Sequence, residues 1–182
     1  MKTAAFFLIF IAALYFGTGG YVILQNEQMY ENALKLEKKE VEYKGTTYHN
    51  YELYRMVRQY GLILKVFPYT QHIPTGVSFI ITAMAFGVVG AIGRVINDTI
   101  RAKQKLSQTA NLLLITAHGA IIGVVILGIS YSIPMLLTGE NIPLKPITVV
   151  FICLLGGIIY DNFYTWFIGA ISKLINKKSE EK

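Results

Sequence analysis

Four long runs of apolar residues divide the chain, and each is long enough to cross a lipid bilayer as a helix. The runs cover residues 3–24, 75–96, 112–133 and 147–168. A helix of about 20 apolar residues spans the hydrocarbon layer, which is ~30 Å thick. The first three runs contain no Asp or Glu, and Arg94 is the only basic residue in any of the four. The pattern predicts an all-α, polytopic membrane protein with four transmembrane helices in a single domain.

The first run could also be read as a secretory signal, because Lys2 precedes it and the small residues 17–20 could hold a cleavage site. The apolar core of such a signal is typically ~7–15 residues long. Here apolar residues resume at Tyr21 and continue to Leu24. We therefore favour an uncleaved first helix.

A loop of about 50 residues, 25–73, separates the first two runs and is the only sizeable segment outside the spans. Its charged first part, 26–39, could extend the first helix by a few turns. Residues 41–48 alternate around Lys-Gly, which predicts a short hairpin. A second helix follows, and Asn50 could cap it. Its apolar stripe consists of Leu53, Met56, Val57, Tyr60 and Leu64.

Seven of the twelve tyrosines fall in this loop. Tyrosine is amphipathic, so it suits either the lipid headgroup layer or a protein contact. Both interpretations remain open. His49 and His72 lack metal-ligand spacing with Cys, Asp or Glu, and we interpret both as ordinary surface residues.

Small residues recur about one turn apart in the second run and again in the third. Lipid gives helices no hydrophobic reason to associate, so close backbone contact at small residues supplies the attraction. Both helices are therefore expected to have a face for tight packing, either within one protomer or between protomers of a homo-oligomer. The candidates are Gly87, Gly90 and Gly93 in the second run and Gly119 and Gly123 in the third.

The formal net charge of +6 comes largely from cations in turns and in the tail, residues 172–182. The compact cluster comprises Arg94, Arg101, Lys103 and Lys105. Basic residues near span ends favour the cytoplasmic side, so both termini are expected in the cytoplasm. The cluster could contact anionic lipid headgroups, at about 1 kcal/mol per cation, or an acidic soluble protein. Because topology already explains the cations, we expect no direct nucleic-acid binding.

Three ionisable residues lie inside the runs, where such groups are functional candidates. Asp161 is expected to pair with Arg94, since both lie toward the same end of helices that run in the same direction. In a competing interpretation the fourth span ends near Asp161, and residues 163–175 form an apolar stripe on the inner interface. His118 could pack structurally, bonded to Thr116 or to a carbonyl, or it could take part in proton or ion movement.

The sequence carries no nucleotide-binding, zinc-protease, nucleophile-elbow or paired-cysteine motif, and no two carboxylates share a run. We therefore expect no catalytic, cofactor or metal site. Cys153 is interpreted as a buried small hydrophobe.

Residues 74–176 combine a glycine-rich run ending in a basic turn, a GxxxG run, a short polar loop and a last run that reads LLGGIIYDNF from Leu154 to Phe163. This arrangement resembles small bacterial four-span proteins encoded in anti-phage defence operons, such as the membrane subunit of the Kiwa system. The resemblance implies an inner-membrane homo-oligomer, a tetramer being one such assembly. It also implies a cytoplasmic partner that carries the effector activity.

Two functional hypotheses follow. The first is a non-enzymatic, oligomeric inner-membrane subunit that senses membrane events or scaffolds a soluble partner. The second is a small oligomeric channel or transporter whose axial pore is lined by His118 or Asp161.

Overall fold

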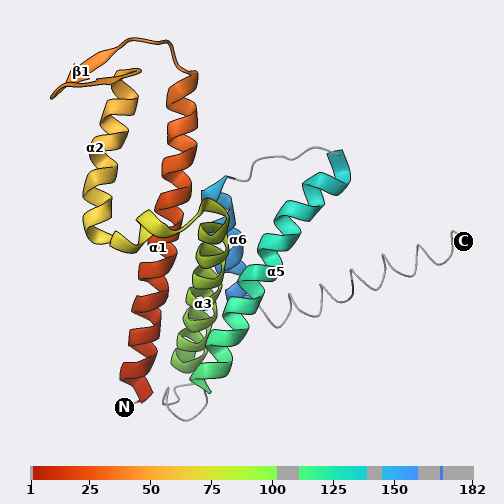
Figure 1. The fold of residues 1–182 in the computed structure, drawn as a ribbon. Helices are drawn as coiled ribbons and strands as arrows, with labels where there is room; N and C mark the ends of the chain where they lie inside the picture. Colours follow the sequence, from red (N-terminus) through yellow and green to blue (C-terminus); the bar gives the residue numbers. More distant parts are fainter. Residues whose placement is uncertain (1, 102–110, 139–144, 160–168, 170–182) are drawn as a thin grey trace, which may run out of the picture.

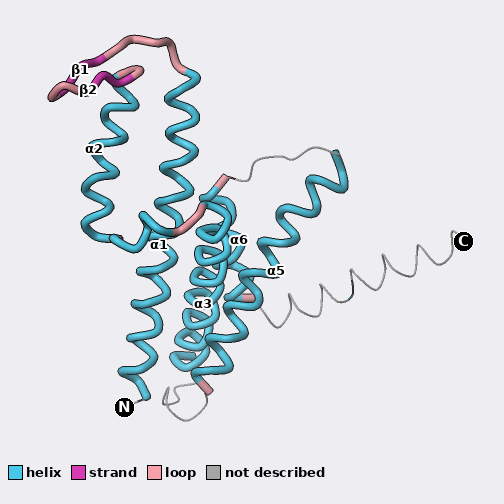
Figure 2. The backbone as a smooth tube through the Cα atoms, viewed as in Figure 1, coloured by secondary structure: helices cyan, strands magenta, loops and turns pink. Residues whose placement is uncertain are grey.

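The computed structural model describes residues 2–101, 111–138, 145–159 and 169, and these parts of the chain are almost entirely helical (Figures 1 and 2). The elements in chain order are α1 (Lys2–Lys35), β1 (Val41–Tyr43), β2 (Thr46–Tyr48), α2 (Tyr51–Val66), η1 (Pro68–His72), α3 (Thr75–Arg101), α5 (Leu112–Thr138) and α6 (Pro146–Ile158).

Three of the described helices, α1, α3 and α5, are long and apolar enough to cross a membrane. Their most apolar segments have mean hydropathies of 2.0, 2.1 and 2.5. The first three apolar runs are therefore helices with the length and hydropathy that a membrane span requires, as predicted. The fourth remains a prediction, because α6 is described for 13 residues only and the rest of that run, including Asp161, lies outside the described residues.

Helix α3 is the centre of the bundle and contacts α5, α6 and α1 (Figure 1). Phe6 of α1 clusters with Ile92 near the end of α3, whereas Gly20 of α1 lies beside Ser78 near its beginning. Helices α1 and α3 are therefore antiparallel. Helix α6 runs parallel to α3, since Pro146 lies near Phe79 and Gly157 lies near Gly90.

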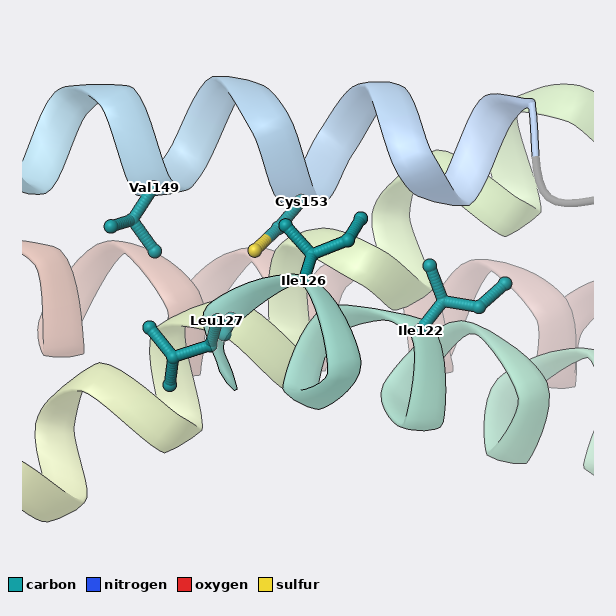
Figure 3. Packing of buried hydrophobic residues seen from close by; sticks show 6 residues of the cluster. Ile122, Ile126, Leu127, Val149 and Cys153 are labelled. Atoms are coloured by element: carbon teal, nitrogen blue, oxygen red, sulfur yellow. The ribbon is translucent and has the colours of Figure 1, made fainter. Parts of the chain in front are cut away.

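The apolar core lies where α3, α5 and α6 meet. Figure 3 shows Ile122, Ile126 and Leu127 of α5 facing Val149 and Cys153 of α6. Val149 and Cys153 are almost completely buried. The interpretation of Cys153 as a buried hydrophobe is thus confirmed.

Residues 25–73, which we call the head, fold into structured elements at one end of the bundle (Figure 1). Helix α1 continues into the head and ends at Lys35. The predicted hairpin is present, with Val41 paired to Tyr48. Lys44 and Gly45 have φ angles of 50° and 77°, as a tight hairpin turn requires.

Asn50 joins the two helices of the head. Its side-chain oxygen accepts a hydrogen bond from the Leu53 amide at 2.9 Å, which confirms the predicted helix cap. Its Nδ2 donates to the carbonyl of Ala33 in α1 at 2.6 Å. One buried side chain therefore starts α2 and attaches it to α1.

Four tyrosines of the head pack on one another. The rings of Tyr43, Tyr48 and Tyr51 surround Tyr54 with centroid distances of 5.0, 5.5 and 5.9 Å. Rings at such distances stabilise each other beyond the area they bury. These tyrosines form a small cluster on the head in which Tyr43 and Tyr51 stay exposed, so contact with lipid headgroups or with a partner remains a prediction.

Candidate functional site

Four of the predicted packing glycines lie in contacts within the protomer. A Cβ added to Gly87 of α3 would meet the carbonyl oxygen of Gly119 in α5, and one added to Gly123 would meet the carbonyl of Ala83. A Cβ on Gly119 would lie 2.8 Å from the Cα of Val88. The two backbones therefore touch, as small residues allow in a membrane.

Gly90 faces a different neighbour, helix α6. A Cβ there would meet the carbonyl of Leu154, and a Cβ on Gly157 would lie 2.8 Å from the amide of Ala91. Gly156 and Gly157 were not among the predicted packing residues, although two adjacent glycines in an apolar run indicate close helix packing. Gly157 lets α6 lie directly against α3, whereas Gly156 lies against Ile126 of α5.

Gly93 has no atom within 4 Å of an added Cβ among the described residues, and it is exposed. Among the described residues it takes part in no helix contact, unlike the other four candidates. The next residue, Arg94, forms an ion pair at 3.3 Å with Asp98, one turn farther along α3.

Asp161, the predicted partner of Arg94, lies outside the described part of the chain. Lys103 and Lys105 of the basic cluster lie outside it too. Arg101 is exposed in the last turn of α3. The two described members of the basic cluster therefore lie at the same end of α3, the end far from the head (Figure 1).

His118 lies on a face of α5 that is exposed in the part of the chain that the structure describes. We call this the outer face of α5. Gly128 on this face has no described atom within 4 Å of an added Cβ. The face combines large apolar residues with two small residues and a histidine, a combination suited to contact with another helix. Its exposed residues are Leu114, Ala117, His118, Ile121, Val124 and Gly128.

An aromatic clamp attaches the head to the first span. The Tyr69 hydroxyl donates a hydrogen bond shared between the carbonyls of Tyr15, at 3.1 Å, and Phe16, at 3.3 Å. The Tyr15 hydroxyl donates in return to the carbonyl of Val66 at 3.0 Å. Phe67 completes the ring cluster, which we call the clamp.

Burial of the Tyr69 phenol, with a contribution from Tyr15, raises its pKa to about 12. The hydroxyl therefore stays protonated and able to donate throughout the physiological range. No local sequence pattern predicts the clamp, because Tyr69 and Tyr15 are 54 residues apart in sequence.

A cavity of about 180 Å³ opens at the head end of the bundle, and all four bundle helices contribute to it. Its lining combines apolar residues with the carboxylates of Glu27 and Glu31. The lining residues are Leu24, Glu27, Gln28, Glu31, Phe79, Tyr131 and Pro146. Glu27 and Glu31 are one helical turn apart and exposed, so the cavity has an acidic rim.

Within the parts of the chain that the structure describes, no three His, Cys, Asp or Glu side chains gather in a metal-binding group. The chain matches no family model, no curated protein and no solved structure in the three comparisons with known proteins.

Proposed function

We propose that this chain is a non-enzymatic, oligomeric subunit of a bacterial inner membrane that senses membrane events or scaffolds a soluble effector. The observation that carries the proposal is the construction of the head. Helix α1 runs without interruption from the bundle into the head, and the clamp ties the far end of α2 back to the same helix. A head fixed at two places moves together with the first span.

Close packing would transmit such movement across the bundle. A Cβ on Gly17 of α1 would lie 3.0 Å from that of Ala85, and a Cβ on Gly20 would meet the Thr82 hydroxyl. Contacts this tight move as a unit, because packed helices are not continuously deformable. A displacement of α1 would therefore reach α3, whose other end carries Arg94 and Arg101.

The basic end of α3 is the proposed docking point for the soluble partner. With both termini in the cytoplasm, Arg101 faces the cytoplasm together with the sequence neighbours Lys103 and Lys105. Such a cluster attracts an acidic protein surface as well as anionic lipid. The resemblance to membrane subunits of anti-phage defence systems suggests an effector as that partner.

Self-association is proposed through the outer face of α5. Gly128 would let a second helix approach closely, and the large apolar residues around it would fill the contact. A tetramer would bring four such faces together.

The second candidate function is an ion channel formed by the same assembly. It is favoured by the exposure of His118 on the outer face of α5, because copies of this face that meet at an axis would place a ring of histidines there. Rings of ionisable side chains set selectivity in ion pores.

Measurements of oligomeric state, ion flux and partner binding test these proposals. A Gly128→Trp substitution should convert the detergent-solubilised oligomer to monomers, whereas Met84→Trp, at an exposed position of α3, should leave it intact. An oligomer that survives Gly128→Trp contradicts assembly through this face. The scaffold is supported if liposomes that contain the protein remain ion-tight and a soluble partner binds the wild type but not Arg101→Glu. The channel is supported if the protein carries an ion flux across the liposome membrane and His118→Ala abolishes it.

A further inference from the structure

We propose that the C-terminal end of α2 inserts among the lipid headgroups on the side of the membrane that holds the head. The inserted tip consists of Leu62, Val66 and Pro68, which are all exposed. The inference depends on the membrane placement of α1 and α3 and is independent of the proposed sensing, scaffolding or channel activity.

The outward face of α2 changes character along the helix. Its first turns present Glu52, Arg55 and Gln59, all exposed and polar. Its last turns present Leu62 and Val66, which are 61% and 59% exposed. The buried side of α2, centred on Met56, faces the other way. An ordinary surface helix stays polar on its solvent side, so the apolar end indicates a different solvent.

The apolar end is also the end that reaches membrane depth. Val66 accepts a hydrogen bond from Tyr15, and Tyr69 bonds to carbonyls of Tyr15 and Phe16. Tyr15 and Phe16 belong to the first apolar run. Figures 1 and 2 show η1 and the lower end of α2 beside α1, level with the beginning of α3. The polar turns of α2 lie farther from the bundle.

The tip continues a lipid-facing surface of α1. Leu8, Ile11 and Tyr15 follow one another at helical spacing and are 68%, 59% and 37% exposed. Tyr15 ends this stripe in direct contact with Val66. A surface that joins the membrane-facing stripe of a spanning helix meets the same solvent, which is lipid.

The charges around the tip suit a phospholipid surface. Two basic residues are exposed in the second half of α2. Arg58 precedes the tip by about one turn, and Lys65 lies within it. Long basic side chains can lie along apolar surface while their charged ends reach the phosphate layer. The chemistry of the occupant is therefore a phospholipid headgroup with the upper part of its acyl chains.

Fluorescent probes on single cysteines test the proposal in vesicles of phosphatidylcholine and phosphatidylglycerol. The tip variant is Leu62→Cys, and the matched control is Gln59→Cys, exposed on the same side of α2 about one turn farther from the tip. Cys153 is fully buried, so the unsubstituted chain measures background labelling. Quenching is compared between aqueous iodide and lipids that carry a spin label high on the acyl chain.

The probe at position 62 should be quenched by the labelled lipid and should show a several-fold smaller iodide quenching constant than the probe at position 59. Equal iodide quenching at both positions would place the tip in water and overturn the proposal. Protection of position 62 from both quenchers would mean that protein covers the tip, and this too would overturn it.

Discussion

The Tyr69 phenol lies directly against Gly19, at the point where η1 crosses α1. A Cβ at Gly19 would overlap the phenol oxygen and lie 2.6 Å from the ring carbon that carries it. Only glycine lets the phenol come close enough to the α1 backbone to share its hydrogen with two carbonyls. The attachment of the head to the first span therefore depends on this one missing side chain.

Replacement of Gly19 by Val should release the clamp without unfolding the bundle. The atom that the new Cβ displaces is the hydroxyl oxygen of Tyr69, which ends a side chain that can rotate away. Hydrogen exchange of the α2 amides should become faster, while exchange in α3 and α5 stays slow. Gly61→Ala is the control, since no described atom lies within 4 Å of an added Cβ there. It should stabilise α2 by about 0.5–1 kcal/mol. Unchanged α2 exchange in Gly19→Val would contradict the role of the clamp.

The clamp should weaken at high pH. The pKa of the Tyr69 phenol is about 12 in the fold against an ordinary value of 10.0. Since the folded pKa lies above the unfolded one, the contribution of the neutral phenol to stability is complete below pH 10 and is lost as the pH rises through about 12. Ultraviolet titration of tyrosinate should show this late step in the wild type. If Tyr69→Phe shows the same late step, the assignment is wrong.

Asn50 should separate two roles when it is substituted in two ways. Asn50→Asp keeps the acceptor for the Leu53 amide and loses the donor to Ala33, whereas Asn50→Ala loses both. Loss of a helix cap costs about 1 kcal/mol. Asn50→Ala should therefore speed exchange of the first α2 amides, and Asn50→Asp should retain their protection while loosening α2 from α1. Equal exchange at these amides in the two variants would argue against the cap.

Glycines of α3 should differ sharply in their tolerance of a methyl group. Gly87→Ala places a Cβ against the Gly119 carbonyl, so the backbones of α3 and α5 must separate. Overpacking of this kind costs about 1–3 kcal/mol. The matched Gly93→Ala places its methyl group in space that no described residue fills. Thermal denaturation in detergent should show a lower midpoint for Gly87→Ala alone; equal midpoints would refute the close contact.

Most of the fold was predictable because local signals specify it. Long apolar runs predict the spans α1, α3 and α5, and the Lys44-Gly45 turn predicts the hairpin. Asn50 could be recognised as a cap from its position just before an apolar stripe. The small-residue pattern correctly indicated close packing at Gly87 and Gly119, but it could not say which glycine meets which helix.

The contacts between distant segments were not predictable. Nothing near Tyr69 in sequence points to Gly19 or Tyr15, because the pairing arises only when η1 folds back on α1. The same applies to the tyrosine cluster around Tyr54, whose rings come from the hairpin and from α2 and meet only in the fold. The apolar end of α2 was not predicted because Leu62 and Val66 lie outside the apolar stripe that the sequence indicates.

If α1, α3 and α5 lie in lipid, the head and the basic end of α3 lie on opposite sides of the membrane. The most direct test is labelling of single cysteines by a membrane-impermeant maleimide in cells with a permeabilised outer membrane. Lys44→Cys marks the head, and Ile100→Cys marks an exposed position near the end of α3. We expect Lys44→Cys to be labelled at once and Ile100→Cys only after the inner membrane is opened. Labelling of both positions from the same side of an intact membrane would contradict this arrangement.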